Sequence, residues 1–332
     1  MNQPKAQEAG AEAQVSFIRG IRNFLSEYVI IYAVVALFII LAITSKAFLS
    51  LDNIMNVLRQ SSMIAIMAAG AFFIMVGDGI DISVGSIVGL SGIVFSIAMV
   101  NWHISPIIAF IMCILTGALA GAVNGWMVTK MGLPPFIATL GMMSVARGLT
   151  YVVTNAYPIA VTIKDIEWLG RGYLWIIPWP VVIMIVVFVI AHFVSQKTRF
   201  GRFVYAAGGN AEAAYLSGIK VSKVKAANYV IAGSLAALSG SILVSRLASG
   251  QPNGGLNWEF EAITATVIGG VSITGGKGKV FGVLMGAILI GLLTNGMTLL
   301  NVSSYYQQMI KGVVLVFAIG LDVYKTKRQN KV

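Results

Sequence analysis

Two acidic residues in the stretch VGDGIDISVGS, Asp78 and Asp81, are the main candidates for chemistry in an otherwise apolar part of the chain. They lie between two apolar runs, among glycines that permit tight turns. Asp81 stands just before Ser83 and resembles an N-cap, because a carboxylate there can accept hydrogen bonds from the unpaired amides of a first helical turn. Two interpretations stay open: a capped turn near the inner surface, or a broken helix, fixed at its start by Asp81, that lines a path.

The other polar groups within or beside apolar runs are mainly amides. Asn124, Asn295, Gln307 and Gln308 could each hydrogen-bond a neighbouring helix or a sugar hydroxyl. Proton-driven carriers place acids or histidines inside their spans, and apart from the two aspartates these runs are almost free of acids. Coupling to protons is therefore poorly supported.

The glycine-rich stretch GGVSITGGKGK (269–279) suggests a phosphate-binding loop but does not have its spacing. Such a loop requires Gly, four residues and then Gly-Lys-Ser/Thr, whereas here Val271 takes the place of the first glycine and Gly278 follows the lysine. The two histidines, His103 and His192, lack metal-ligand spacing. We expect no catalytic residue, no metal site and no nucleotide site on this chain, and interpret 269–279 as a flexible turn.

Composition places the chain in a membrane, since 58% of its 332 residues are hydrophobic and only 11% are charged. A soluble domain carries about a quarter charged residues. Apolar runs long enough to cross a bilayer, which takes roughly 20 residues, predict an all-α polytopic bundle of about ten helices. The expected spans are 28–45, 60–77, 82–100, 105–128, 136–154, 174–195, 224–246, 260–274, 280–300 and 306–323.

The distribution of Lys and Arg predicts the orientation of these spans. Cytoplasmic loops carry an excess of basic residues, and with both termini inside, 16 of the 23 basic residues become cytoplasmic. The net charge of +11 then reflects topology and contact with anionic lipid, not nucleic-acid binding. The expected regions are a cytoplasmic tail (1–26), a membrane domain (27–324) with a basic cytoplasmic loop (196–225), and a basic cytoplasmic tail (325–332).

The outer loops are aromatic and mildly acidic. Their acids, including Glu259 and Glu261, could meet an external partner, and their tryptophans suit a membrane-interface belt. Arg147 and Lys311 are expected near span ends, with their charged tips reaching the interface or an outer acid.

A loose echo between GALAGAVNGW (117–126) and GAILIGLLTNGM (286–297) suggests two repeated five-helix halves, as in many transporters.

The cytoplasmic loop contains a short, well-capped polar helix. Asn210 suits the N-cap, Glu212 complements the first-turn dipole and Gly218 suits the C′ position. The predicted helix, Ala211 to Ser217, is too short to be stable alone. It must pack on its own bundle or on a soluble partner, and an alanine-rich surface formed by Ala211, Ala213 and Ala214 would suit a docking groove.

Several motifs then carry a resemblance over nearly the whole chain. AAGGNAEAAYLSGI, GDGIDISVGS, LPPFIATLGMMSVARGLTYVVT, KTRFGR, SRLASGQPN, AITATVIGGVSITGGKGK and VSSYYQQMIKGVVLVFAIGLD occur in the same order in permease subunits of ABC sugar importers, in the ribose/galactose/xylose branch. The sequence is similar to that family, although NWEFEAITA has Phe260-Glu261-Ala262 where Leu-Asp-Ala is usual.

The resemblance implies a machine of several subunits in the bacterial inner membrane, importing a monosaccharide, ribose above others, by alternating access. Two permease copies would form a homodimer, a periplasmic or lipid-anchored sugar-binding protein would deliver substrate, and a cytoplasmic ABC ATPase would bind ATP and magnesium, leaving this chain without a cofactor. The resemblance implies an ATPase-coupling helix made by Asn210, Ala211, Glu212, Ala213, Ala214, Leu216 and Gly218.

On this interpretation the residues expected to line the translocation path are Asp78, Asp81, Ser83, Asn124, Phe136, Asn295 and Gln307. The alternatives are a stand-alone secondary sugar carrier, for which the two aspartates are the sole candidates for ion coupling, and a membrane enzyme or scaffold, for which the sequence offers no catalytic set.

Overall fold

The computed structural model describes residues 29–162 and 164–329, and within them it shows a helical bundle with a few two-residue strands. The predicted all-α class is confirmed for this part of the chain. The predicted tail 1–26 and the last three residues of the tail 325–332 lie outside the described residues, whereas residues 325–329 continue the last helix.

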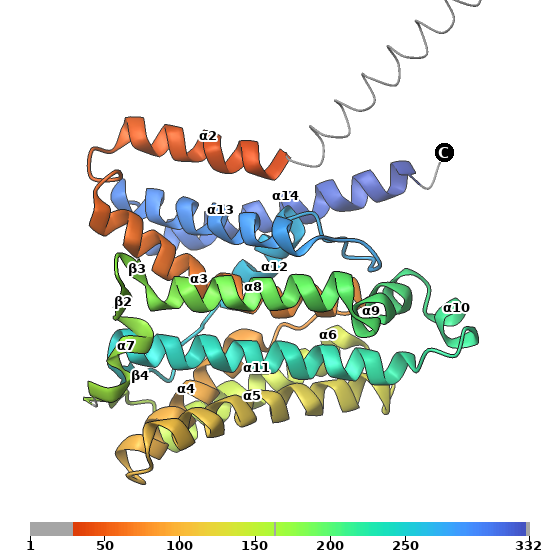
Figure 1. The fold of residues 1–332 in the computed structure, drawn as a ribbon, viewed down its shortest axis with the longest axis horizontal. Coiled ribbons are helices and arrows are strands. Elements are labelled where there is room, and N and C mark those ends of the chain that lie inside the picture. Colours follow the sequence, from red (N-terminus) through yellow and green to blue (C-terminus); the bar gives the residue numbers. More distant parts are fainter. Residues whose placement is uncertain (1–28, 163, 330–332) are drawn as a thin grey trace, which may run out of the picture.

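Two successive sets of five helices build the bundle (Figure 1). The first set is α2 (Val29–Thr44), α3 (Leu51–Val76), α4 (Val84–Val100), α5 (Pro106–Thr129) and α6 (Pro135–Thr154). The second set is α8 (Trp179–Lys197), α11 (Val221–Leu247), α12 (Trp258–Ile268), α13 (Val280–Leu299) and α14 (Ser304–Gln329). Corresponding helices run in opposite directions: α3 ends near α9, where α11 begins (Figure 1).

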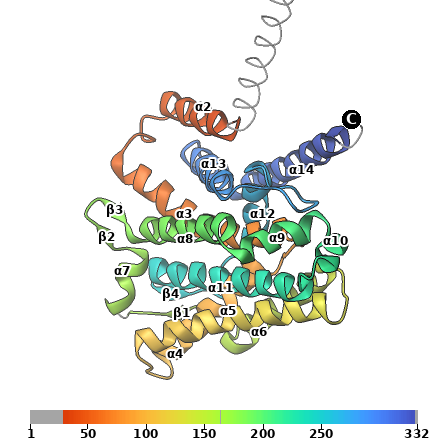
Figure 2. The ribbon, with the colours of Figure 1, turned by 45° about the vertical axis from the view of Figure 1, so that its right-hand side comes forward.

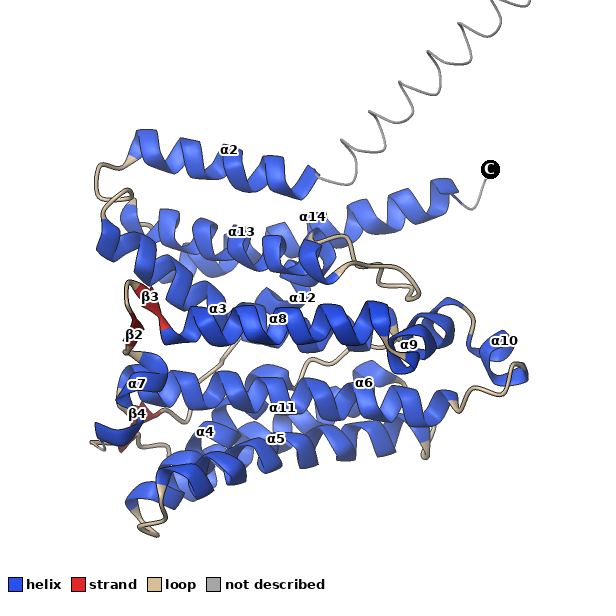
Figure 3. Cartoon of the chain, in the orientation of Figure 1, coloured by secondary structure: helices blue, strands red, loops and turns tan. Residues whose placement is uncertain are grey.

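The connections at the two ends of the bundle differ in structure. At one end lie β1 (Ile159–Ala160), paired antiparallel with β4 (Ser249–Gly250), and β2 (Tyr173–Leu174), paired antiparallel with β3 (Ile177–Pro178), as Figure 3 shows. The 3₁₀ turn η1 (Lys164–Ile166) and the single-turn helix α7 (Glu167–Gly170) lie beside them. At the opposite end lie α9 (Arg199–Gly209) and α10 (Ala211–Leu216), and α2 begins and α14 ends toward that same end of the bundle.

Seven helices of the described residues are long and apolar enough to cross a membrane: α3, α5, α6, α8, α11, α13 and α14. Two shorter apolar helices lie in α2 and α4. The expected continuous span 260–274 is wrong. It is replaced by α12, whose 11 residues extend about 16 Å, roughly half of the hydrocarbon core. The helix ends because Gly269 and Gly270 follow it, the latter at a φ of 87°.

The core lies along α3 and α11, which are surrounded by the other helices (Figure 2). The second half of α3, from Ser61 to Val76, is buried throughout. Helix α11 packs closely along α5 because small residues face each other, and a Cβ on Gly117 or Gly121 would overlap the α11 backbone. Close backbone approach of this kind drives helix association in membranes, where apolar burial alone gives no gain over lipid.

Candidate functional site

The start of α4 is held inside the bundle by a buried polar cluster. The Asp81 carboxylate accepts hydrogen bonds from the Ser83 amide at 2.8 Å and the Ser83 hydroxyl at 2.6 Å. Asn124 of α5 donates to Asp81 at 3.3 Å and to Ser83 Oγ at 2.9 Å. The helix begins at Val84 with Ser83 as its N-cap, so Asp81 orders the turn before the helix and is not the N-cap that the sequence suggested.

The start of α12 lies beside the start of α4 and is held by Arg147. This side chain comes from α6, and its Nη1 donates to the carbonyls of Pro252 and Gly254 at 2.8 and 2.9 Å. Its Nη2 donates to the Gly85 carbonyl, in the first turn of α4, at 3.3 Å. One guanidinium therefore ties together the beginnings of two helices, using the several donors of its rigid fork.

Glu259 lies at the same junction. It is buried, its Oε2 has no hydrogen-bond partner, and a Cβ on Gly85 would overlap its carboxylate. The expectation of an exposed outer acid at Glu259 is therefore wrong. Residues 251–257 return from the β4 end into the bundle before α12 begins, and that carries the acid inward. Arg147 is half-buried and bonded to main-chain carbonyls, so its tip does not extend to the bundle end. Of the two expected alternatives it follows the second, since its charge acts on Glu259, one of the acids assigned to the outer loops.

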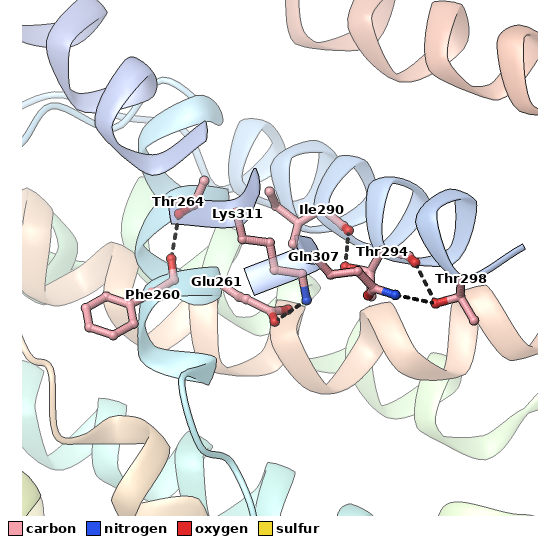
Figure 4. Close-up of polar contacts among 8 residues, drawn as sticks. All are labelled: Phe260, Glu261, Thr264, Ile290, Thr294, Thr298, Gln307 and Lys311. Carbon is pink, nitrogen blue, oxygen red and sulfur yellow. Dashed lines mark hydrogen bonds and ion pairs between the residues drawn. The ribbon is translucent and has the colours of Figure 1, made fainter. Parts of the chain in front are cut away.

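A pocket of about 500 Å³ opens between α12, α13 and α14 (Figure 4). In it Lys311 Nζ lies 2.7 Å from the Glu261 carboxylate, and the side chains of the pair are 22% and 16% exposed. Gln307 also lines the pocket and donates to the Val302 carbonyl at 2.9 Å. The lining residues are Leu256, Asn257, Trp258, Phe260, Glu261, Thr264, Ile290, Ser304, Gln307, Gln308, Lys311, Gly312, Leu315 and Val316.

The predicted path residues are distributed over several places. Asp81, Ser83 and Asn124 come together, while Gln307 lies in the pocket. Asp78 has a φ of 59° and forms an ion pair with Lys225 at 3.1 Å near the α10 end.

The remaining two predicted path residues join neither cluster. Asn295 exchanges hydrogen bonds with Asn53 of α3, at 2.8 and 3.2 Å, toward the opposite end of the bundle. Phe136 is half-exposed at the start of α6. The expectation that Lys311 could reach an outer acid is confirmed, and the acid is Glu261. Which acid it meets could not be predicted from the sequence, because packing brings together two helices that α13 separates in the chain.

Helix α10 has the predicted caps. The Asn210 carboxamide oxygen accepts from the Ala213 amide at 2.9 Å, and Gly218 adopts a φ of 84°. The Gly218 amide bonds to Tyr215 and the Ile219 amide to Ala214, which is a Schellman motif. The helix ends at Leu216, one residue earlier than expected.

The exposed surface of α10 differs from the predicted one. Ala211 and Ala213 are exposed, but Ala214 is buried against the bundle and cannot belong to a docking surface in this arrangement. The tip instead presents Tyr215 and Leu216, which are 70% and 79% exposed. Glu212 is exposed in the first turn. Large apolar groups at the tip of a short polar helix are typical of a contact surface.

The turn 269–279 is packed against the bundle and α9. Gly276 donates to the carbonyl of Val76, at the end of α3, at 2.8 Å. Tyr205 of α9 donates to the Gly278 carbonyl at 2.8 Å, and burial raises the pKa of this hydroxyl, which keeps the proton in place for donation. The glycines are required because Gly275 and Gly276 have φ values of 79° and 71° and lie against backbone. The turn therefore links α9 to α12.

The fold, with seven described helices long and apolar enough to cross a membrane and polar groups inside the bundle, is that of a polytopic membrane protein. The family described as the branched-chain amino acid transport system / permease component matches residues 53–319, and the chain belongs to this family. It is therefore a transport subunit in a membrane and not an enzyme.

Curated relatives align along nearly the whole chain. The ribose import permease of Haemophilus influenzae is 41% identical over 308 residues, which cover 92% of this chain and 95% of the relative. The ribose import permease of Bacillus subtilis is 44% identical over 292 residues, 87% of this chain and 90% of the relative. The xylose transport system permease of H. influenzae is 34% identical over 366 residues, covering 92% and 98%. No solved structure matches the chain.

Proposed function

We propose that this chain is the permease subunit of an ATP-driven ABC importer that carries a monosaccharide, ribose above others, across the bacterial cytoplasmic membrane. The observation that carries the proposal is the end-to-end similarity to two ribose import permeases, at 41% and 44% identity. A mainly apolar pocket with several hydrogen-bonding groups, beside the apolar helices α13 and α14, supports it, since neutral sugars need such groups along their path.

The proposed ATPase contact is α10 together with its flanking residues. A capped helix with an exposed Tyr215–Leu216 tip offers a compact apolar surface for a cytoplasmic partner. Basic residues concentrate around it in the loop 196–225 and at both ends of the chain, and this supports N- and C-termini in the cytoplasm with ten crossings in all. ATP and magnesium would bind the ATPase. The segment 269–279 of this chain does not have the spacing of a phosphate loop.

A mechanical route leads from this contact to the interior. Movement of α10 would shift α9, and the Tyr205–Gly278 hydrogen bond would transmit the shift to the turn before α13. That turn follows α12 directly, so the wall of the pocket would move with it. Nucleotide binding on the ATPase would thereby switch the side to which the pocket opens, and the sugar would contribute only its differential affinity for the two states.

We further propose that two permease copies form a homodimer, with the face of α12 and α14 toward the partner. Glu261, Gln307 and Lys311 line a pocket on the outside of the single chain, although they lie on helices of the membrane bundle. Charged groups facing lipid are costly, whereas a protein-lined, wet cavity accommodates them. The aromatic loops at the β1–β4 end would receive a sugar-binding protein.

The direct test is uptake of radiolabelled ribose into liposomes that contain this chain with its ATPase, with the binding protein outside. Uptake that requires ATP inside the liposomes is expected. Equal uptake with and without ATP would contradict the proposal and indicate a passive or secondary sugar carrier. If ribose is not taken up, a panel of pentoses, hexoses and polyols with the same ATP comparison separates a wrong sugar from a wrong class.

The coupling role has its own test. Gly218→Val places a β-branched residue at a φ of 84°, which only glycine adopts readily. Glu212→Lys reverses a favourable charge in the first turn. Both variants should still insert into the membrane, but sugar uptake should fall while ATP hydrolysis continues. Unchanged uptake in both variants would overturn the coupling role of α10.

A further inference from the structure

The Glu261–Lys311 pair has an unusual position for two charges in a membrane bundle. Its partners come from α12 and α14, lie 2.7 Å apart, and face a pocket of about 500 Å³ (Figure 4). Removing two charges from water costs more than their attraction returns unless further hydrogen bonds satisfy them. The side chains of Glu261 and Lys311 remain 16% and 22% exposed and both line the pocket, so the pair keeps bonding capacity for a ligand.

The other side chains of the lining can complement a hydroxylated ring. Gln308 supplies an amide that both donates and accepts, Gln307 supplies its carboxamide oxygen because its nitrogen already donates to Thr298 and Val302, and Ser304 supplies a hydroxyl. Trp258 and Phe260 lie in the same lining and offer flat apolar surface. A sugar combines a ring of hydroxyls with apolar C–H faces, so it can satisfy both kinds of lining in one orientation. The pocket volume lies in the usual range for small-ligand sites.

The net charge of the pocket lining favours uncharged ligands over charged ones. Because Glu261 and Lys311 neutralise each other, the pocket offers no net charge to a ligand. A phosphorylated sugar or a sugar acid would meet the Glu261 carboxylate, and like charges in a low-dielectric site repel strongly. An amino acid zwitterion would have to separate the pair in order to bind both ends. Neighbouring sugar hydroxyls can bridge it, accepting from Lys311 and donating to Glu261.

We propose that this pocket is a substrate subsite of the permease for neutral, uncharged polyhydroxylated molecules such as monosaccharides. Glu261 accepts hydrogen bonds from substrate hydroxyls, Lys311 donates to them, and the carboxamide oxygen of Gln307, whose nitrogen already donates to Val302 and Thr298, accepts from them. The subsite gives the permease a selectivity of its own, in addition to that of any protein that delivers the sugar. The proposal rests on the proposed sugar-transport function and adds to it the residues that bind the substrate.

A single cysteine can report on the occupancy of the pocket. Gly312 lines it, and a Cβ there would meet no atom within 4 Å. The one native cysteine, Cys113, is buried. Gly312→Cys in the purified chain should react with a small methanethiosulfonate reagent, and ribose should slow the reaction. Gly141→Cys on α6, also in open space, is the matched control whose rate ribose should leave unchanged.

Comparing the protection given by different ligands distinguishes a neutral sugar from a charged sugar or an amino acid as the occupant of the pocket. Ribose should protect Gly312→Cys, whereas ribose 5-phosphate and leucine should protect at least tenfold less well. Equal protection by leucine would contradict the proposal and indicate an amino acid site. Absence of protection by ribose and by the wider panel of neutral sugars and polyols, at concentrations that saturate uptake, would overturn the subsite.

Substitution of Glu261 and Lys311 tests whether these two side chains bind the sugar. In the Gly312→Cys background, Glu261→Gln and Lys311→Met should each weaken protection about tenfold or more, the usual effect of losing a hydrogen bond to a charged group. The double variant leaves no unpaired charge and should remain as weak. Lys46→Met, which removes an exposed cation elsewhere, should not change protection. Normal protection in the double variant would exclude the pair as ligands.

The labelling result is independent of ATP-driven uptake. ATP-dependent uptake without protection by any sugar of the panel would overturn the subsite and leave the importer intact. Protection without ATP-dependent uptake would support the subsite while contradicting the importer.

Discussion

Helices α4 and α12 hold corresponding places in the two sets of five helices, and both begin inside the bundle. The start of α4 is closed: Asp81, Ser83 and Asn124 are buried and bonded to one another. The start of α12 leads instead to the mainly apolar pocket in which Glu261 and Lys311 form an ion pair. The difference indicates that the first set of helices can form a rigid support, while the second set carries the side chains that would contact a substrate.

The largest expected effect comes from breaking the junction between the two halves. Arg147→Met removes three hydrogen bonds that tie α4 to the segment before α12 and leaves Glu259 without a nearby cation. A hydrogen bond to a charged group typically contributes about 1.5–3 kcal/mol, and this change removes three of them. We expect a large drop in the thermal midpoint of the detergent-solubilised protein.

Arg147→Lys provides the control, since it keeps the charge but cannot form the fork of donors. It should recover only part of the stability. A midpoint equal to that of the wild type in Arg147→Met would show that the junction is not held by this residue.

A smaller loss of stability is expected from replacing either of two asparagines at corresponding positions, and the two losses should differ. Asn124→Leu removes the two hydrogen bonds that Asn124 donates to buried Asp81 and Ser83, which should cost about 1–3 kcal/mol although Ser83 still donates to Asp81. Asn295→Leu removes one half-buried partner from Asn53 and should cost about 1 kcal/mol or less. Thermal unfolding of both variants measures the difference, and equal losses would contradict a closed first half and a looser second half.

The smallest effect is expected where α9 meets the turn before α13. Tyr205→Phe removes the hydrogen bond to the Gly278 carbonyl and should cost about 1 kcal/mol of stability. If this bond transmits motion, uptake per ATP hydrolysed should fall by more than the stability loss explains. Phe200, which packs near Phe73 of α3, supplies a control: Phe200→Leu should lower stability without changing that ratio.

Much of the fold could be predicted from the sequence, because long apolar runs and basic loops are strong local signals. The caps of α10 were equally readable, since Asn210 and Gly218 act on their own neighbours. The start of α12 inside the bundle could not be predicted from the sequence. The segment NWEFEA has the composition of an outer loop, and only tertiary packing places Glu259 in the interior. For Lys311 the sequence predicted an outer acid as a possible partner but not which one, since Glu261 and Lys311 meet through helix packing.

The central claim, that the second half lines the substrate path while the first half frames it, can be tested at two corresponding glycines. Gly312 follows Gly141 at the same distance in sequence at which Asn295 follows Asn124, and a Cβ at either glycine would meet open space. ATP-driven ribose uptake would be measured for Gly312→Cys and Gly141→Cys before and after reaction with a bulky thiol reagent. The account predicts that the reagent blocks uptake only in Gly312→Cys. Block in Gly141→Cys alone, or no block in either labelled variant, would contradict it.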